Sequence, residues 1–279
     1  MAVPESSGVR MPVSVAKQLI RRFPGKLPAY RYRLAVRRAP RVPALLAFEV
    51  REAARAVRAF GRRPSAAVAV VVPTYKRPQQ LVAAVESVLA QTCGDLVVVV
   101  VDDGAGLPPL PEDERVHAYS LSRNCGVAGV VRNVGIRASS SRYLAFLDDD
   151  NTWLPNHLEA ALAAHGAGAE LTYSALERVL ADGTVKDVFS VPFDRARMRE
   201  TAISDTNTIV VQRRPGVHFS RVPLRHGDFP LEDWVLVYRL SRRLRTEHVP
   251  VPTARYLVHD GSFYTNWANA QVQDARRAS

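Results

Sequence analysis

The sequence predicts an α/β fold in which helices flank a mostly parallel central sheet. Residues 68–72 and 96–101 are continuous apolar runs rich in Val, as expected of strands covered on both faces. Between them, residues 79–91 carry apolar side chains at helical spacing. A helix at 126–138 and a third apolar strand at 143–147 continue this strand–helix alternation, which is typical of parallel sheets.

The remaining elements are predicted from shorter signals. An apolar stretch at 116–121 indicates a short strand, and 154–165 has the spacing of a helix. The second half of the chain is more mixed. Strands are expected at 171–174, 185–189, 203–211 and 254–258, and a helix at 232–242.

Length and composition limit the class of protein. A chain of 279 residues with 47% hydrophobic residues can form one large domain or two small ones with a sizeable core. No segment has the apolar length of a transmembrane helix, and the N-terminus lacks the apolar core of a secretory signal. The two cysteines, Cys93 and Cys125, do not form a disulfide framework. We therefore expect a cytoplasmic protein.

The positive charge is concentrated near the N-terminus. Residues 10–63 contain 15 Lys or Arg against only two acids, Glu49 and Glu52, whereas the whole chain carries +11. Residues 1–63 are therefore predicted to form a basic helical N-terminal extension, with helices at 13–23 and 45–60. One interpretation is a helical arm packed on the main domain. The other is peripheral attachment of residues 10–63 to anionic lipid. Nucleic-acid binding is not expected, since no RNA-binding aromatic motif or zinc-finger spacing accompanies the charge.

Three adjacent carboxylates, Asp148, Asp149 and Asp150, follow directly after the strand at 143–147. In an open α/β sheet, ligands bind beyond the carboxyl ends of the strands. Carboxylate oxygens are the ligands that Mg²⁺ or Mn²⁺ prefers, together with the oxygens of a substrate phosphate. The triplet therefore predicts a divalent metal site. The alternative is an acidic turn that caps the next helix.

Two other predicted strands end in polar residues, at Pro73-Thr74-Tyr75 and at Asp102-Asp103-Gly104. The sequence contains neither G-x-G-x-x-G nor G-x-x-x-x-G-K-[ST], so an NAD-type Rossmann site and a P-loop are not expected. For Asp102 and Asp103, a simple Asx-turn after the strand is the alternative to a ligand-binding role.

Five short motifs, in this order and spacing, resemble those of the inverting glycosyltransferases of family 2, which have the GT-A fold. The matching stretches are VVVPTYKR at 70–77, VVDDG at 100–104, NCG at 124–126 with RNVGI at 132–136, FLDDD at 146–150 and LEDW at 231–234. The resemblance covers residues 66–258. One departure is the stretch at 105–109, which is stiffer and less polar than the Ser/Thr-rich loop common in that family.

The resemblance implies a donor that is a nucleotide-diphosphate sugar, linked to UDP, dTDP or GDP. It implies that Asp103 accepts a hydrogen bond from the base. Tyr75 would lie against the base or ribose, and Thr74, next to Pro73, would hold it. Arg132 would lie on the nucleotide side. For Arg132 a structural salt bridge is the alternative to a ligand contact.

The metal assignments also come from the resemblance. Asp150 is the first candidate for a direct ligand of Mg²⁺ or Mn²⁺. Asp148 would bind the ribose, or the metal through water, and Asp149 would lie nearer the sugar. His259, beyond the last predicted strand, is a candidate for a further metal ligand, although a lone histidine is more often structural.

Asp233 is the candidate general base, because it opens a predicted helix and can face a cleft from the helix N-terminus. The neighbouring Glu232 adds a like charge, which raises a carboxylate pKa. By taking the proton of the acceptor hydroxyl, Asp233 would support a single displacement that inverts the anomeric centre. The alternative is that Glu232 and Asp233 only favour the helix dipole.

Together these features predict a metal-dependent inverting glycosyltransferase with a GT-A domain at 64–279, of which 64–150 binds the nucleotide sugar and 151–279 the acceptor. Trp153, Trp234 and the loop at 225–229 are expected on the acceptor side, although core packing is the more common role for any single tryptophan. The acceptor class stays open between a small molecule, a peptide and a lipid-linked glycan. The competing hypotheses are a non-catalytic protein of the same fold that binds membrane or nucleic acid, and a sugar-nucleotide pyrophosphorylase. The latter should have a Gly-rich basic loop in place of residues 73–76.

Overall fold

The computed structural model describes residues 39–223 and 232–258. The predicted helix at 13–23, the predicted acceptor loop at 225–229 and His259 lie outside the described residues.

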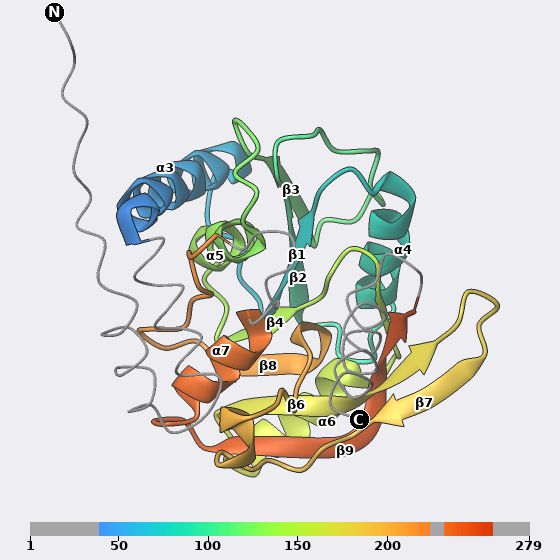
Figure 1. Cartoon of the computed structure of the whole chain (residues 1–279). Helices are drawn as coiled ribbons and strands as arrows, with labels where there is room; N and C mark the ends of the chain where they lie inside the picture. Colours follow the sequence, from blue (N-terminus) through green and yellow to red (C-terminus); the bar gives the residue numbers. More distant parts are fainter. Residues whose placement is uncertain (1–38, 224–231, 259–279) are drawn as a thin grey trace, which may run out of the picture.

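The described residues form a nine-stranded sheet in the order β3-β2-β1-β4-β8-β6-β9-β5, with β7 paired to β6 (Figure 1). Its first half is entirely parallel. It consists of β3 (Val116–Ser120), β2 (Leu96–Asp102), β1 (Val68–Thr74) and β4 (Tyr143–Phe146). The register places Thr74 opposite Asp102. The polar residues that follow these strands therefore meet at one edge of the sheet.

The second half of the sheet is mixed. The strand β8 (Ile209–Gln212) runs antiparallel to both β4 and β6 (Leu171–Val179). The strand β9 (Thr246–Leu257) runs parallel to β6, while β5 (Thr152–Trp153) and β7 (Val185–Phe189) pair antiparallel with their neighbours. The predicted α/β class is confirmed, and the parallel pairing is concentrated in the half that carries the aspartate motifs.

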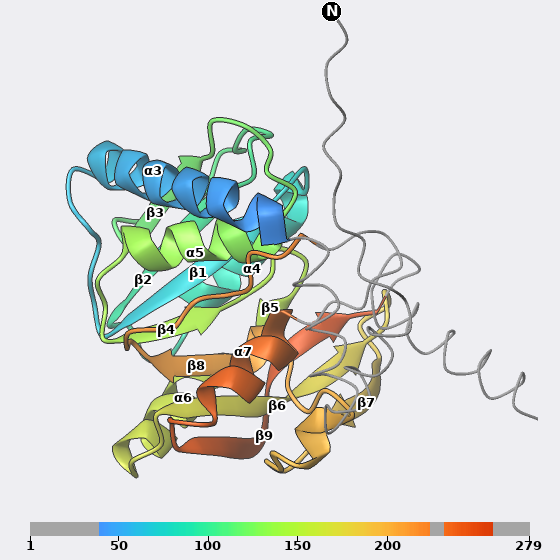
Figure 2. The ribbon, with the colours of Figure 1, turned by 60° about the vertical axis from the view of Figure 1, so that its left-hand side comes forward.

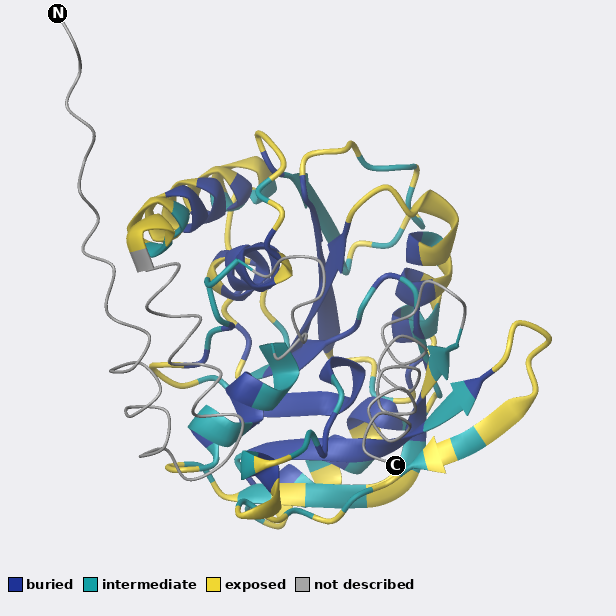
Figure 3. Cartoon of the chain, in the orientation of Figure 1, coloured by how far each residue is buried: buried dark blue, intermediate teal, exposed yellow. Residues whose placement is uncertain are grey.

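Helices cover both faces of the sheet (Figures 1 and 2). The side chains of β1 alternate between them: Val68, Val70 and Val72 pack in the cluster that contains α4 (Pro78–Leu89) and α6 (His157–Gly166). Ala69 and Val71 pack in the opposite cluster. Helices α5 (Ala128–Ala138) and α7 (Glu232–Leu240) contribute to that second cluster. All seven residues of β1 and of β2 are buried, as their apolar runs predict (Figure 3).

Helix α3 (Val42–Phe60) forms a further layer on α5 and follows a 3₁₀ turn, η1 (Ala39–Arg41). Its Phe48 is 1% exposed and packs with Val99 and Val101 of β2. The helix begins three residues earlier than predicted and ends at Gly61, whose φ of +74° closes the helix in a left-handed cap. Among the described residues, no helix combines the length and apolarity needed to cross a bilayer.

Three strand predictions in the second half were wrong in extent. In place of a continuous strand over 203–211, the chain forms a 3₁₀ turn, η3 (Thr206–Thr208), before β8 begins at Ile209. The reason is local, since the Asp205 carboxylate accepts the Asn207 N–H at 2.9 Å and so competes with sheet pairing. Strands β6 and β9 are longer than predicted because they pair with each other, through a register shift near Ser174 and Ala175. Another short 3₁₀ turn is η2 (Arg197–Arg199).

Candidate active site

The loop after β1 is joined to the aspartate triplet. The Thr74 hydroxyl donates to Asp149 Oδ2 at 2.7 Å, and the Tyr75 N–H approaches the same oxygen at 3.4 Å. Pro73 is buried opposite Val101 of β2. Two predicted donor-binding loops are therefore brought together at the carboxyl edge of the sheet.

The same loop turns an arginine back onto the triplet. Lys76 has a φ of +57°, an uncommon value for a residue other than glycine, and such positions cluster at functional sites. After this turn, Arg77 Nη1 contacts Asp149 at 2.9 Å and Asp150 at 2.7 Å. Tyr75 is left 42% exposed, so its ring is accessible as its predicted role requires.

Asp102 at the end of β2 forms a tight turn. Its Oδ2 accepts the N–H groups of Ala105 and Gly106, each at 2.8 Å, and the Ser120 hydroxyl at 2.5 Å. The turn predicted as the alternative role is therefore present at Asp102. Its Oδ1 is buried and has no hydrogen-bond partner within the described part of the chain.

Asp103 holds the loop that precedes α5. Its two oxygens accept the N–H groups of Cys125 at 2.8 Å and Gly126 at 2.9 Å, and its own N–H donates to Thr74 O at 2.9 Å. The next residue, Gly104, has φ +76°, and a Cβ there would lie 2.5 Å from the backbone carbon of Arg123. Each carboxylate oxygen has a second lone pair, so Asp103 keeps the capacity to accept a further donor.

The Cys125 thiol does not support nucleophilic catalysis. Burial, and next the charge of Asp103, raise the pKa of this thiol to about 12. The thiol therefore stays protonated at neutral pH, and thiolate is the reactive form.

Arg132, in the first turns of α5, joins the triplet to α7. It is 5% exposed, donates to Asp148 Oδ1 at 2.5 Å and also pairs with Glu232. Its guanidinium lies 5.0 Å from the centre of the Phe219 ring. Burial lowers the pKa of Arg132, but the charges of Asp148 and Glu232 outweigh it and the pKa is raised. Of the two predicted roles, the structure shows the salt bridge.

Asp205 is a site residue that the sequence interpretation missed. It precedes η3, and its neighbour Asn207 accepts the Asp148 N–H at 2.7 Å. Burial, and the charges of Asp148 and Asp150, raise the pKa of Asp205 despite two hydrogen bonds from Asn207. The signal in the sequence was the polar run at 204–208 inside an otherwise apolar stretch.

Asp233 lies in the first turn of α7, where its Oδ1 accepts the Trp234 N–H at 2.6 Å. Burial, and next the charge of Asp205, raise its pKa well above the ordinary aspartate range. A carboxylate whose pKa is raised toward neutral is suited to accept a proton at physiological pH. We call the set that meets here the acidic cluster: Asp148, Asp149, Asp150, Asp205, Glu232 and Asp233.

The acidic cluster contains the carboxylates that could hold a divalent cation. Burial and the charge of Asp148 raise the pKa of Asp150, although Arg77 opposes them, so negative charge there is only partly balanced. Within the described residues, no group of three or more His, Cys, Asp or Glu has metal-binding geometry. A site with one or two carboxylates and the oxygens of a diphosphate, as Mg²⁺ often uses, fits these residues.

The two tryptophans expected on the acceptor side differ. Trp153 is 4% exposed, its indole N–H donates to Asn207 O at 2.7 Å, and its ring stacks on His157. It is a core residue, which is the alternative role expected of a single tryptophan. Trp234 is half-buried and donates to Met198 O at 2.5 Å.

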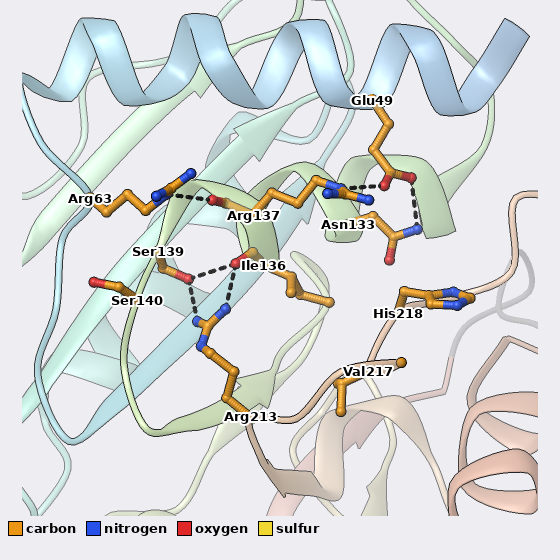
Figure 4. Close-up of a pocket in the computed structure, with 11 residues that line it drawn as sticks. Glu49, Arg63, Asn133, Ile136, Arg137, Ser139, Ser140, Arg213, Val217 and His218 are labelled. Carbon is orange, nitrogen blue, oxygen red and sulfur yellow. Dashed lines mark hydrogen bonds and ion pairs between the residues drawn. The ribbon is translucent and has the colours of Figure 1, made fainter.

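A separate pocket of about 430 Å³ lies along α5 (Figure 4). Its lining includes Glu49 of α3, Arg137 of α5 and Arg213 after β8. Ser140, at one end, donates its N–H to Pro64 O just before β1. This end therefore lies at the amino edge of the sheet, opposite the aspartate triplet, and none of the predicted site residues lines the pocket.

The curated relatives are bacterial glycosyltransferases and polysaccharide biosynthesis proteins. The chain is 38% identical over 129 residues to the succinoglycan biosynthesis protein ExoO of Rhizobium meliloti, covering 44% of this chain and 37% of that protein. It is 23% identical over 208 residues to WfaP of Escherichia coli, named UDP-Glc:alpha-D-GlcNAc-diphosphoundecaprenol beta-1,3-glucosyltransferase, covering 71% and 80% of the two chains. The match thus spans little more than a third of ExoO.

Solved structures show the fold. TarS 1-349 of S. aureus in complex with UDP-GlcNAc matches with a TM-score of 0.53 at 16% identity, covering 71% of this chain and 60% of that one. Mannosyltransferase PcManGT of Pyrobaculum calidifontis, in complex with GDP-Man and Mn²⁺, matches with a TM-score of 0.51 at 16% identity, covering 80% and 68%. The GT-A fold expected from the sequence is confirmed.

The family model for glycosyl transferase family 2 matches residues 69–228, which is more than half of the chain and includes β2, β4, the aspartate triplet and all of β1 except Val68. The chain therefore belongs to glycosyl transferase family 2.

Proposed function

We propose that this protein is a metal-dependent inverting glycosyltransferase that moves a sugar from a nucleotide-diphosphate donor to an acceptor hydroxyl. The observation that carries the proposal is the convergence of Asp103, the triplet and Asp233 at one edge of the sheet, with the pKa of Asp233 raised. The proposal is supported by neighbours in the fold whose structures contain UDP-GlcNAc or GDP-Man with Mn²⁺.

Each residue has a distinct part in the proposed reaction. Asp103 and Tyr75 receive the base and ribose, with Thr74 and Pro73 shaping the loop. Asp150 and Asp148 would hold Mg²⁺ or Mn²⁺, which supplies Lewis-acid stabilisation of the departing diphosphate. Asp149 keeps the β1 loop in place through Thr74.

The proton is handled by Asp233, which takes it from the acceptor hydroxyl as the oxygen attacks the anomeric carbon. Glu232 is tied to Arg132, and Arg132 to Asp148, so the base and the donor side are linked by one buried guanidinium. A base on the face opposite the leaving group gives a single displacement, and hence inversion.

Calorimetric binding of UDP, dTDP and GDP, each with and without Mn²⁺, tests this function. We expect one nucleotide to bind tightly, with an affinity that depends on the metal. Absence of binding to all three under both conditions would contradict the proposal and favour a non-catalytic protein of the same fold. Turnover of a sugar phosphate with a nucleoside triphosphate would instead indicate a pyrophosphorylase.

We further propose a cytoplasmic enzyme that attaches peripherally to the membrane through residues 10–63 and acts on a lipid-linked glycan. The supporting observation is the outer face of α3, where both glutamates are buried and the exposed residues include Leu46, Val50, Arg51, Arg55 and Arg58. Cations that flank apolar side chains suit an anionic lipid surface. The name of WfaP, which acts on a diphosphoundecaprenol-linked sugar, agrees with such an acceptor.

Co-sedimentation with phosphatidylglycerol vesicles tests the membrane contact. Binding should weaken with added salt and in the double variant Arg51→Glu, Arg58→Glu, while vesicles of phosphatidylcholine alone should bind poorly. Equal binding to both kinds of vesicle, or binding to RNA in their place, would contradict it.

A further inference from the structure

Two fully buried glutamates lie one turn apart on α3. Glu49 and Glu52 are both 0% exposed, although α3 lies outside the residues that the family model matches. A buried carboxylate is tolerated only where charged or hydrogen-bonding partners surround it. The partners of these two carboxylates show what α3 holds in place.

Glu49 binds a segment that leads toward the proposed base. Arg221 contacts it in a bidentate pair, with both N···O distances 2.7 Å. Arg137 Nε donates to Oε1 at 2.7 Å, and the Asn133 side-chain amide donates to Oε2 at 2.9 Å. Figure 4 shows the carboxylate reaching from α3 down to both α5 residues. Glu49 therefore joins α3 and α5 to residues 217–222.

The contacts continue from Asn133 to the catalytic side. Asn133 accepts the Phe219 N–H at 2.7 Å and donates to Phe219 O at 3.1 Å. The Phe219 ring lies edge-on to Phe146 of β4 and beneath Arg132. Arg132 in turn pairs with Glu232, next to Asp233. Helix α5 and the segment at 217–222 are in close contact, since a Cβ on Gly129 would lie 2.2 Å from Ser220 O.

Glu52 binds a different segment. The Ser122 N–H and hydroxyl each donate to its carboxylate at 2.9 Å, and the Tyr119 hydroxyl donates at 3.1 Å. Ser122 begins the loop at 122–126, whose Cys125 amide is held by Asp103. Glu52 therefore fixes, from the outside, the loop that Asp103 fixes from the donor side.

We propose that Glu49 and Glu52 are positioning residues for opposite halves of the active site, and the inference rests on the function proposed above. Glu49 positions the segment that carries Phe219, and Phe219 lies beneath Arg132. Glu49 thereby also positions the ion pair of Arg132 with Glu232 on α7, next to the base. Glu52 positions the loop of the donor nucleotide. The helix α3 thereby sets the donor and base sides relative to each other, a task for which a displacement of about 1 Å is costly.

The test compares Glu49→Gln and Glu52→Gln, which keep the side-chain shape, with Ala56→Gly as a control. Ala56 is buried on the same helix, and its side chain has no polar atom that could bind the partners of Glu49 or Glu52. The substitution Ala56→Gly should therefore lower the stability of the helix without removing any of their hydrogen bonds. For each variant we would measure the urea midpoint, the Kd of the nucleotide that binds wild type, and release of nucleoside diphosphate from UDP-glucose, dTDP-glucose and GDP-mannose. Hydrogen exchange would be followed at 122–126 and 217–222.

We expect Glu52→Gln to weaken nucleotide binding about tenfold and Glu49→Gln to lower kcat about tenfold, each leaving the other quantity within about twofold. Exchange should rise at 122–126 only in Glu52→Gln and at 217–222 only in Glu49→Gln. Equal effects of the two variants, or the same effects in Ala56→Gly at a matched urea midpoint, would overturn the inference.

Milder substitutions keep the test decisive if a glutamine variant does not fold. Ser122→Ala removes one hydrogen bond to Glu52, and Arg221→Lys removes the bidentate pair with Glu49. Ser122→Ala should weaken nucleotide binding and Arg221→Lys should lower kcat, each by less than the glutamine variants. The reverse assignment of these effects, or no difference between the two variants, would overturn the inference. Lack of turnover by wild type with all donors would contradict the proposed function, while the exchange pattern still decides the positioning roles.

Discussion

The carboxylates at the ends of β2 and β4 are held in different ways. Those of Asp102 and Asp103 accept backbone N–H groups from residues 105–106 and 125–126. Those of Asp148 and Asp150 are paired with the guanidinium groups of arginines. Backbone donors cannot leave without refolding a loop, whereas an arginine side chain can change partner by rotation.

The carboxylates at the β2 end are therefore fixed by the backbone, whereas those at the β4 end can exchange an arginine for another cationic partner. At the β2 end, backbone hydrogen bonds fix Asp103 to its loop, which would suit the proposed recognition of a base. At the β4 end, Arg77 is 45% exposed in its side chain, and it balances Asp149 and Asp150 only in part. A cation or a diphosphate arriving there could take over a partner of the exposed Arg77, so we assign the proposed chemistry to the β4 end.

The largest effect should come from the base beside the β4 end. Asp233→Asn keeps the hydrogen bond acceptor that meets the Trp234 N–H but cannot take a proton. We expect glycosyl transfer to fall by about 10²–10⁴-fold, since that is what general acid–base groups contribute. The measurement is single-turnover transfer from the donor that calorimetry identifies.

Nucleotide affinity is the control for that variant. Because Asp233 lies on α7 and Asp103 directly follows β2, the Kd should stay within a few-fold of wild type. Wild-type turnover in Asp233→Asn would remove this residue from the mechanism, and a large loss of nucleotide binding would show that the two ends are not separate.

The loss of stability on substitution should be larger at the β2 end than at the β4 end. Asp103→Asn leaves one of the Cys125 and Gly126 amides facing an amide nitrogen, a buried mismatch that costs about 1–3 kcal/mol of unfolding free energy. Arg77→Gln, at the exposed β4 pair, should cost at most about 1 kcal/mol. Urea denaturation of both variants measures this, and a larger loss in Arg77→Gln would contradict the distinction between fixed and exchangeable carboxylates.

A smaller effect is expected on metal affinity, which Arg77→Gln should increase although it lowers stability. Removing the guanidinium in Arg77→Gln leaves Asp149 and Asp150 with less positive charge beside them, so Mn²⁺ should bind about two- to fivefold more tightly. Asp150→Asn removes a candidate ligand and should weaken Mn²⁺ binding. Titration of Mn²⁺ in the presence of the bound nucleotide measures both, and equal shifts in one direction would show that Arg77 does not compete with the cation.

The sequence was sufficient to predict the parallel half of the sheet because the signals for its strands are local. Continuous Val-rich runs specify buried parallel strands, and an aspartate directly after such a run must lie at the carboxyl edge. The partners of those aspartates were not predictable. Whether Arg132 binds a ligand or bridges Asp148 and Glu232 depends on residues 100 positions apart meeting in space.

The N-terminal charge shows the same limit. Counting residues gave Glu49 and Glu52 as two acids in a basic segment, while the structure turns both inward and leaves the arginines of α3 exposed. Helical spacing could have placed both on one face together with Phe48 and Ala56. Their partners Ser122 and Arg221 lie 70 and 172 residues away, so no local pattern identifies them.

The smallest predicted effect concerns Asp205, which couples the acidic cluster to the base. As the proposed general base, Asp233 must be deprotonated to act, so kcat/KM should rise as pH increases through its pKa. Burial is the larger cause of the raised pKa and the charge of Asp205 the next. Asp205→Asn removes that charge and keeps an acceptor for the Asn207 N–H, so the acid limb of the pH profile should move to lower pH. The midpoint of the acid limb should stay above the ordinary aspartate range because burial is unchanged.

Asp113→Asn, a change at a remote carboxylate paired with Arg115, should leave the acid limb in place. A limb that moves equally in both variants, or that moves to higher pH in Asp205→Asn, would show that the charge of Asp205 does not set the pKa of the base.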